Sequence, residues 1–324
     1  MKTNFFILLL ISISFLSCFH KNSESSSSGE TGGTSTCDSG LTKFTPPSGK
    51  QDGAAENSAG ERRILMATST DGLTFTRTNT ILSDQANTPN MITYDDGTIN
   101  VYYTGAELDG SNDGIGVAVS SDLGSTWEYC LVNFIDFPEG VRQVDPDIVR
   151  NSDGTYTMYT TSGIGSSGDI GIYYSTSNDG YNFTYGGLSF DHTEAILDSL
   201  TMIIDGAYHQ YVLKGASAEF VYATSGDGTS FDYMEDQIPQ IDSKTYILSN
   251  WMHLDEGFRI YAFSLENNDI KSFTTTNGQT LTAESGQRLA FDSSNSQESS
   301  FVKDAAVVEL SDGTYLMTYV SEIP

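Results

Sequence analysis

The stretch "QVDPDIVRNSDGTYTMYTTS" (143–162) contains the pattern that decides the fold. Its centre is the pair Asp153-Gly154, which lies between two runs rich in valine, isoleucine, tyrosine and threonine. An Asp-Gly pair between such runs is a strong signal for a β-hairpin, because glycine accepts the positive φ angles of a tight turn. The stretch therefore predicts two antiparallel strands joined by a short turn.

The same hairpin pattern recurs along the chain. The turn glycines of the five copies are Gly97, Gly154, Gly206, Gly257 and Gly313. A second turn recurs out of phase with the first, as "STDGLTF" (69–75), "SSDLGSTW" (120–127), "SNDGYNF" (177–183), "SGDGTSF" (225–231) and "TNGQTL" (276–281). Two hairpin turns per repeat give four strands. Five repeats of four strands predict an all-β fold, a five-bladed β-propeller over residues 61–324.

The order of the turns predicts how the ring closes. The chain begins with a turn of the second type (69–75) and ends with one of the first type at Gly313. Residues 62–80 should therefore supply the outer two strands of the blade whose inner two are 301–321. Such closure removes an open sheet edge. Both kinds of turn then lie at one rim of the propeller, and the long loops between blades lie at the other. We expect binding or catalysis at the loop rim.

The N-terminal segment has the layout of an export signal. An apolar run over 5–17 follows Lys2 and precedes Cys18, and it is shorter than the ~20 residues that span a bilayer. "FLSC" (15–18) resembles the lipobox of bacterial lipoproteins, which implies a signal peptide over 1–17 and lipidation of Cys18; an ordinary signal peptide is the alternative. Phe19 stands where an inner-membrane retention signal often has Asp, which favours the outer membrane of the cell envelope. The polar residues from 18 to 60 predict a disordered tether.

Composition narrows the choice of partners. The formal net charge is −28 with 15 Lys and Arg, which argues against nucleic acid and restricts membrane contact to the lipid anchor. We expect a soluble monomer without a cofactor. The acidic loop "ELDGSNDG" (107–114) has oxygen-rich spacing suited to Ca²⁺, although a plain polar loop explains it equally. Cys37 and Cys130 could form a disulfide in an exported protein or remain two free thiols.

Candidate site residues emerge when the inner strands are aligned on their turn glycines. Two positions on one strand face hold polar residues that could converge on the channel mouth, namely Asn90, Asp145, Asp147, Asn250 and Asp304. Asp198 and Glu194 lie near the start of the third inner strand. Clustered carboxyl groups can catalyse glycoside hydrolysis, because one protonates the leaving oxygen and another activates water. The alternative is structural, with the acids bonding backbone amides of neighbouring blades.

The motifs "DPDIVRNSDGTYTMYTT" (145–161) and "DGTYLMTYVS" (312–321), with the Ser-x-Asp-Gly turns, resemble the propellers of glycoside hydrolase families 43 and 32. Residues 120–127 also match the Asp-box of sialidases and other propellers. The resemblance implies a base, a pKa-tuning acid and a general-acid Glu on successive inner strands. Asp145 or Asp147 fits the second role and Glu194 the third, whereas Asn90 occupies the slot where the families have Asp.

Further residues are candidates for substrate binding. Trp251 could stack on a sugar ring beside Asn250 and His253, or it could fill the space between two blades. Arg142 could bind an anionic substrate or pair with Asp145 or Asp147. Two functions follow, a carbohydrate-active glycosidase-like enzyme and a non-catalytic propeller that binds glycan or protein at the cell envelope.

Overall fold

The computed structural model describes residues 37, 40–54, 58–105, 114–138, 142–163, 170–215, 219–237 and 246–324. The predicted signal peptide, the lipidation site Cys18 and the part of the tether before Cys37 lie outside these residues. So does nearly all of the acidic loop considered for calcium. Among the described residues, no helix combines the length and apolar character needed to cross a membrane.

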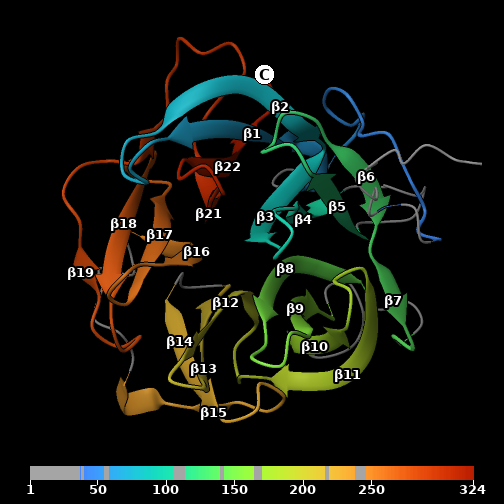
Figure 1. The fold of residues 1–324 in the computed structure, drawn as a ribbon, viewed down its shortest axis with the longest axis vertical. Helices are drawn as coiled ribbons and strands as arrows, with labels where there is room; N and C mark the ends of the chain where they lie inside the picture. Colours follow the sequence, from blue (N-terminus) through green and yellow to red (C-terminus); the bar gives the residue numbers. More distant parts are fainter. Residues whose placement is uncertain are drawn as a thin grey trace, which may run out of the picture. The chain divides into compact units, whose positions relative to one another are not determined.

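Five β-sheets surround a central channel, which confirms the predicted five-bladed β-propeller (Figure 1). From the channel outward, blade 1 consists of β3 (Ala86–Thr93), β4 (Ile99–Gly105), β5 (Gly114–Ser120) and β6 (Glu128–Leu131). Blade 2 consists of β8 (Gln143–Arg150), β9 (Tyr156–Ser162), β10 (Gly171–Ser177), β11 (Asn182–Phe190) and β7 (Asn133–Ile135). Blade 3 consists of β12 (Ile196–Ile204), β13 (Ala207–Lys214), β14 (Phe220–Ser225) and β15 (Asp232–Tyr233).

The last two blades complete the ring. Blade 4 consists of β16 (Ile247–His253), β17 (Phe258–Ser264), β18 (Asp269–Thr275) and β19 (Thr282–Ala283), with β20 (Leu289–Ala290) also paired to β18. Blade 5 consists of β21 (Lys303–Glu309), β22 (Tyr315–Glu322), β1 (Arg62–Ser69) and β2 (Thr76–Asp84). Because β1 pairs with β22 along its whole length, from Arg62 with Glu322 to Ser69 with Tyr315, the predicted splicing of the two ends is confirmed. Two short 3-10 turns, η2 (Ala59–Glu61) and η3 (Glu235–Gln237), complete the described elements.

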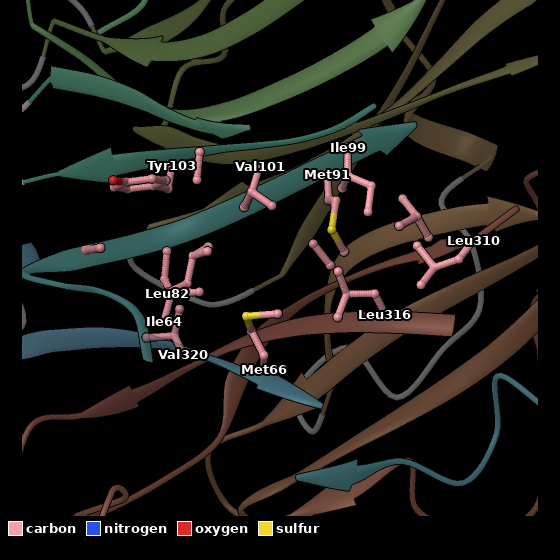
Figure 2. Close-up of a cluster of buried hydrophobic side chains, with 14 residues drawn as sticks. Ile64, Met66, Leu82, Met91, Ile99, Val101, Tyr103, Leu310, Leu316 and Val320 are labelled. Carbon is pink, nitrogen blue, oxygen red and sulfur yellow. The ribbon is translucent and has the colours of Figure 1, made fainter. Parts of the chain in front are cut away.

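Among the residues that the structure describes, the hydrophobic core forms five clusters, each between two neighbouring blades. Successive side chains of a strand point to opposite faces of its sheet, so each blade presents one apolar face to each neighbour. Figure 2 shows the cluster between blades 5 and 1, where Met66 and Leu316 meet Met91 and Ile99. The middle strands β4 and β9 are buried on both faces, and neither of their sequences, INVYYTG and YTMYTTS, contains a charged residue.

A repeated tyrosine links most neighbouring blades. Its hydroxyl donates to the backbone carbonyl of the turn glycine in the next blade. These pairs are Tyr102 with Gly180, Tyr159 with Gly228, Tyr211 with Gly278 and Tyr261 with Gly72. Thr318 occupies the equivalent place in blade 5, and the packing of that blade on blade 1 rests instead on the cluster in Figure 2.

Every inner strand has a β-bulge near the loop rim. Four of the bulges contain a non-glycine residue with a left-handed φ between 44° and 55°, namely Thr88, Asp145, Asp198 and Asp304. In blade 4 the extra residue is Ser249. Bulges turn a side chain away from the regular strand direction, and they are frequent beside functional sites. In this propeller the five bulges place their side chains at one level of the channel. These side chains are Thr88, Asp145, Asp198, Ser249 and Asp304.

Part of the predicted tether contacts the propeller. Residues 42–44 run along β6, where Leu131 N–H donates to the Thr42 carbonyl (2.9 Å) and Phe44 N–H donates to the Tyr129 carbonyl (3.2 Å). Gly49 N–H donates to the Asp84 carboxylate at 2.6 Å. A disulfide joins Cys37 to Cys130, which resolves the two alternatives left open above. Disorder up to residue 60 is therefore wrong for the described residues 40–54.

Candidate active site

A small cavity at the loop rim brings together three of the candidate acids. Asp145, Asp198 and Asp304 line it from the bulges of blades 2, 3 and 5, and Thr88 and Ser249 line it from blades 1 and 4. Its volume is about 30 Å³, which is room for one water molecule. We call it the acidic cavity.

Threonines of the neighbouring blades position these acids. The Asp145 amide donates to Thr104 Oγ1 (2.8 Å), and the Asp198 amide donates to Thr161 Oγ1 (3.2 Å). Thr88 Oγ1 donates to Asp145 Oδ1 (3.1 Å). Because the bulge leaves its own amide outside the strand ladder, a side chain from the preceding blade satisfies that amide and fixes the direction of the carboxyl group.

The environment of the acidic cavity favours protonated acids. Burial is the main cause that raises the pKa of Asp145 above its usual range. Burial first, and then the nearby carboxylates of Asp145 and Asp304, raise the pKa of Asp198 well above its usual range. The side chains of Asp145 and Asp198 are also hydrogen-bonded to each other. Two carboxyl groups in such contact share one proton, since both cannot ionise cheaply side by side.

Asp304 differs from the other two acids because it has a cationic partner. Lys303 Nζ lies 2.6 Å from Asp304 Oδ2. The acidic cavity thus combines a carboxyl pair that holds a proton with a carboxylate beside an ammonium group. Across the described ranges, no group of three or more His, Cys, Asp or Glu side chains is arranged to hold a metal ion.

Asp147 does not face the channel. It is 1% exposed and lies between blades 2 and 3, where its carboxyl group accepts hydrogen bonds from the hydroxyl and the amide of Thr201. Asn90 of blade 1 also donates to it through Nδ2 (3.4 Å). Burial raises the pKa of Asp147 to about 7. The predicted convergence of Asp147 on the channel mouth is therefore wrong, and the structural alternative holds for this residue. Asn90 is buried as its partner and touches the acidic cavity.

Glu194 and Arg142 lie away from the acidic cavity. Glu194 is exposed and pairs with Lys214 (Nζ to Oε1, 2.9 Å), and this hydrogen bond is the main cause that lowers its pKa. A general acid benefits from the opposite shift, and Glu194 is not among the residues that line the acidic cavity. Arg142 is half-buried just before β8 and is not among the residues that line the acidic cavity.

The remaining candidates lie nearer the other end of the channel. Asn250, Trp251 and His253 line a cavity of about 850 Å³ that all five inner strands form next to the Asp-Gly turns. Asn250 Oδ1 accepts from the Val307 amide of blade 5 (2.9 Å), while Trp251 Nε1 donates to the Thr201 carbonyl of blade 3 (2.7 Å). Asn250 and Trp251 therefore connect neighbouring blades, as the structural alternative predicts. We call this space the turn-rim cavity; Asn90 touches both cavities.

Two features of the acidic cavity were missed or misplaced by the alignment on turn glycines. The blade 3 hairpin has only two turn residues, Asp205 and Gly206, so counting back from Gly206 selects Leu197 and misses Asp198 by one position. The alignment also does not select Lys303, although this residue directly precedes Asp304 in the sequence.

Comparison with known proteins identifies similar folds. A scan of protein-family models and a search of curated proteins found no match. A thermostable family-43 glycoside hydrolase superposes with a TM-score of 0.54 at 14% identity, covering 73% of this chain and 88% of that one. A β-xylosidase has a TM-score of 0.52 at 13% identity, covering 73% and 91%.

A candidate glycoside hydrolase from Parabacteroides distasonis has a TM-score of 0.54 at 16% identity, covering 74% of this chain and 87% of that one. At such low identities the likeness is one of fold alone. The chain therefore has the five-bladed β-propeller fold that glycoside hydrolases of this kind also have.

Proposed function

We propose that this protein acts on carbohydrate, and that the acidic cavity hydrolyses a glycosidic bond. The observation that carries the proposal is the convergence of Asp145, Asp198 and Asp304 from equivalent bulges of three blades. Glycosidases need one carboxylic acid that is protonated near neutral pH and one carboxylate that handles water. Asp198, whose pKa is raised, suits the first role, and Asp304, which lies beside Lys303, suits the second.

Each acid has a separate role in the proposed reaction. Asp198, whose pKa is raised, donates its proton to the glycosidic oxygen as the bond from that oxygen to the anomeric carbon breaks. Asp145 shares the hydrogen bond with Asp198 and orients it. Asp304 accepts the proton of the water that attacks the anomeric carbon, and Lys303 supports the carboxylate by charge. The water-sized cavity suits the attacking molecule, with the sugar above it at the loop rim.

A screen of the purified protein on aryl-glycosides and polysaccharides tests this proposal. On any substrate that is turned over, Asp198→Asn should lower kcat about 10²- to 10⁴-fold, because general acid catalysis contributes that much. The wild-type rate should fall as the pH rises through the raised pKa of Asp198. Glu128→Gln is the matched control, an exposed acid on an outer strand, and should keep the wild-type rate. Full activity in Asp198→Asn would refute the assignment.

The second candidate is a glycan-binding propeller without turnover. It is favoured by the size of the acidic cavity, about 30 Å³, and by the contact of Asp304 with Lys303, which ties up one carboxylate. Binding to a glycan array with no hydrolysis of any bound glycan would select this candidate over the enzyme.

We also propose that the protein is a monomer held to the cell envelope by lipid on Cys18, at the outer membrane rather than the inner. The support is the sequence alone, with the apolar run and "FLSC" before the polar segment. Radiolabelled palmitate should enter the wild type and not Cys18→Ala, and the variant should leave the membrane fraction. Membrane association of an unlabelled Cys18→Ala chain would contradict the anchor.

A further inference from the structure

We propose that the turn-rim cavity is a second ligand site, which binds a small organic cation with an apolar body. All five inner strands contribute to this cavity, and its volume of about 850 Å³ lies within the range of small-molecule sites, ~300–1,000 Å³. It lies at the opposite end of the channel from the acidic cavity. The inference therefore does not depend on the proposed function.

The walls of the turn-rim cavity suit an apolar body. Ile203, Met252, Val307 and Val308 line it together with Trp251. The Trp251 ring is held on several sides, by its hydrogen bond to the Thr201 carbonyl and by edge contacts with neighbouring rings at centroid distances of 5.0 and 5.5 Å. A fixed indole attracts a cation to its face. The ring is thus positioned before any ligand arrives.

The charges at the mouth of the turn-rim cavity favour a positive ligand. Asp153 and Glu309 line the mouth, and the only cation among the described lining residues, apart from His253, is Arg150. Both Arg150 Nη atoms bond the Asp95 carboxylate at 2.5 Å, which compensates the guanidinium charge. Hydrogen bonds from Thr155 lower the pKa of Asp153, so this carboxylate is ionised at neutral pH. Burial lowers the pKa of His253, which keeps its ring neutral there.

One buried amide at the inner part of the cavity points to an oxygen on the ligand. Asn250 is 3% exposed and lines the turn-rim cavity. Its Oδ1 accepts from the Val307 amide, whereas its Nδ2 forms no hydrogen bond with any part of the chain that the structure describes. This amide group is therefore available to a ligand in the cavity. A hydroxyl or carbonyl oxygen at the far end of the ligand would satisfy it.

Three molecules of nearly equal shape test the charge preference. They are tyramine, which is a cation, tyrosol, which is neutral, and 4-hydroxyphenylacetate, which is an anion. Binding is measured by calorimetry and by the fluorescence of Trp251 in a Trp127→Phe background, because the chain has 2 tryptophans. We expect tyramine to bind at least tenfold more tightly than tyrosol and the anion to bind least. Equal or tighter binding of tyrosol, of the anion or of a neutral monosaccharide would overturn the proposal, as would the absence of binding by tyramine.

Two variants locate the site. The double change Asp153→Asn with Glu309→Gln affects exposed side chains and should weaken tyramine about tenfold while leaving tyrosol unchanged. Glu266→Gln removes one acid from the opposite rim and should change neither affinity. Trp251→Ala should weaken tyramine about 10- to 30-fold, with Trp251→Phe restoring part of the loss. Wild-type affinity in the Asp153/Glu309 variant would place the ligand elsewhere.

Discussion

Glu298→Ala is expected to lower the free energy of unfolding by about 3–5 kcal/mol, the typical cost of breaking a buried ion pair. The Glu298 side chain is fully buried, and its carboxylate bonds Arg77 of β2 at 2.5 and 2.9 Å. It also accepts from the Tyr319 hydroxyl of β22 (2.8 Å) and the Asn295 amide (3.0 Å). Its loss would leave the Tyr319 hydroxyl without its acceptor and the Arg77 guanidinium with only the Ala290 carbonyl inside the closing blade.

Urea unfolding followed by circular dichroism measures this effect. Glu298→Gln keeps the shape of the side chain and should lie between the wild type and the alanine variant, because it keeps one acceptor oxygen. Arg150→Ala is the control, since it breaks an exposed pair and should cost under about 1 kcal/mol. If Glu298→Ala cost no more than Arg150→Ala, the network around Glu298 would not contribute to the closure of blade 5.

Loss of the disulfide between Cys37 and Cys130 is expected to cost about 4–5 kcal/mol. The bond closes a loop with a sequence separation of 93 residues, and constraint of the unfolded chain grows with loop length. Both cysteines are buried, at 1% and 0% exposure, in the cluster between blades 1 and 2. The bond also holds residues 42–44 against β6.

Thermal melts with and without reductant, on the wild type and on Cys130→Ser, measure the contribution. Reductant should lower the Tm of the wild type to that of Cys130→Ser and should leave the Tm of the variant unchanged. Residues 40–54 should then become accessible to protease before the blades do. Equal Tm values for oxidised wild type and Cys130→Ser would show that the bond does not stabilise the fold.

The ring was predictable because turn chemistry repeats. Glycines with positive φ at equivalent positions, such as Gly97, Gly154 and Gly313, revealed the hairpins, and the order of the turns revealed how the termini join. The site was less predictable. Period-two alternation groups residues that share a sheet face, but in a propeller that face meets the next blade, so Asp147 lies between blades.

The direction of Asp145, Asp198 and Asp304 depends on bulges, which strand periodicity does not reveal. In blade 3 the turn glycine follows its bulge acid by eight residues, from Asp198 to Gly206, whereas in blade 2 it follows by nine, from Asp145 to Gly154, and this difference hid the equivalence of Asp198. The turn-rim cavity was not foreseen either. Its lining comes from the ends of all five inner strands, and their meeting depends on the radius of the ring rather than on any one motif.

The pairing of β1 with β22 determines when the propeller can complete its fold. A ribosome makes Arg62 long before Glu322, its partner across the strand pair. Until β22 is made, β1 and β2 have only each other as hydrogen-bonded strand partners, and a two-stranded hairpin is marginally stable in water. Contacts between residues so distant in sequence also form slowly. Native closure must therefore wait for the synthesis of β22, and the first two strands need protection from other chains until then.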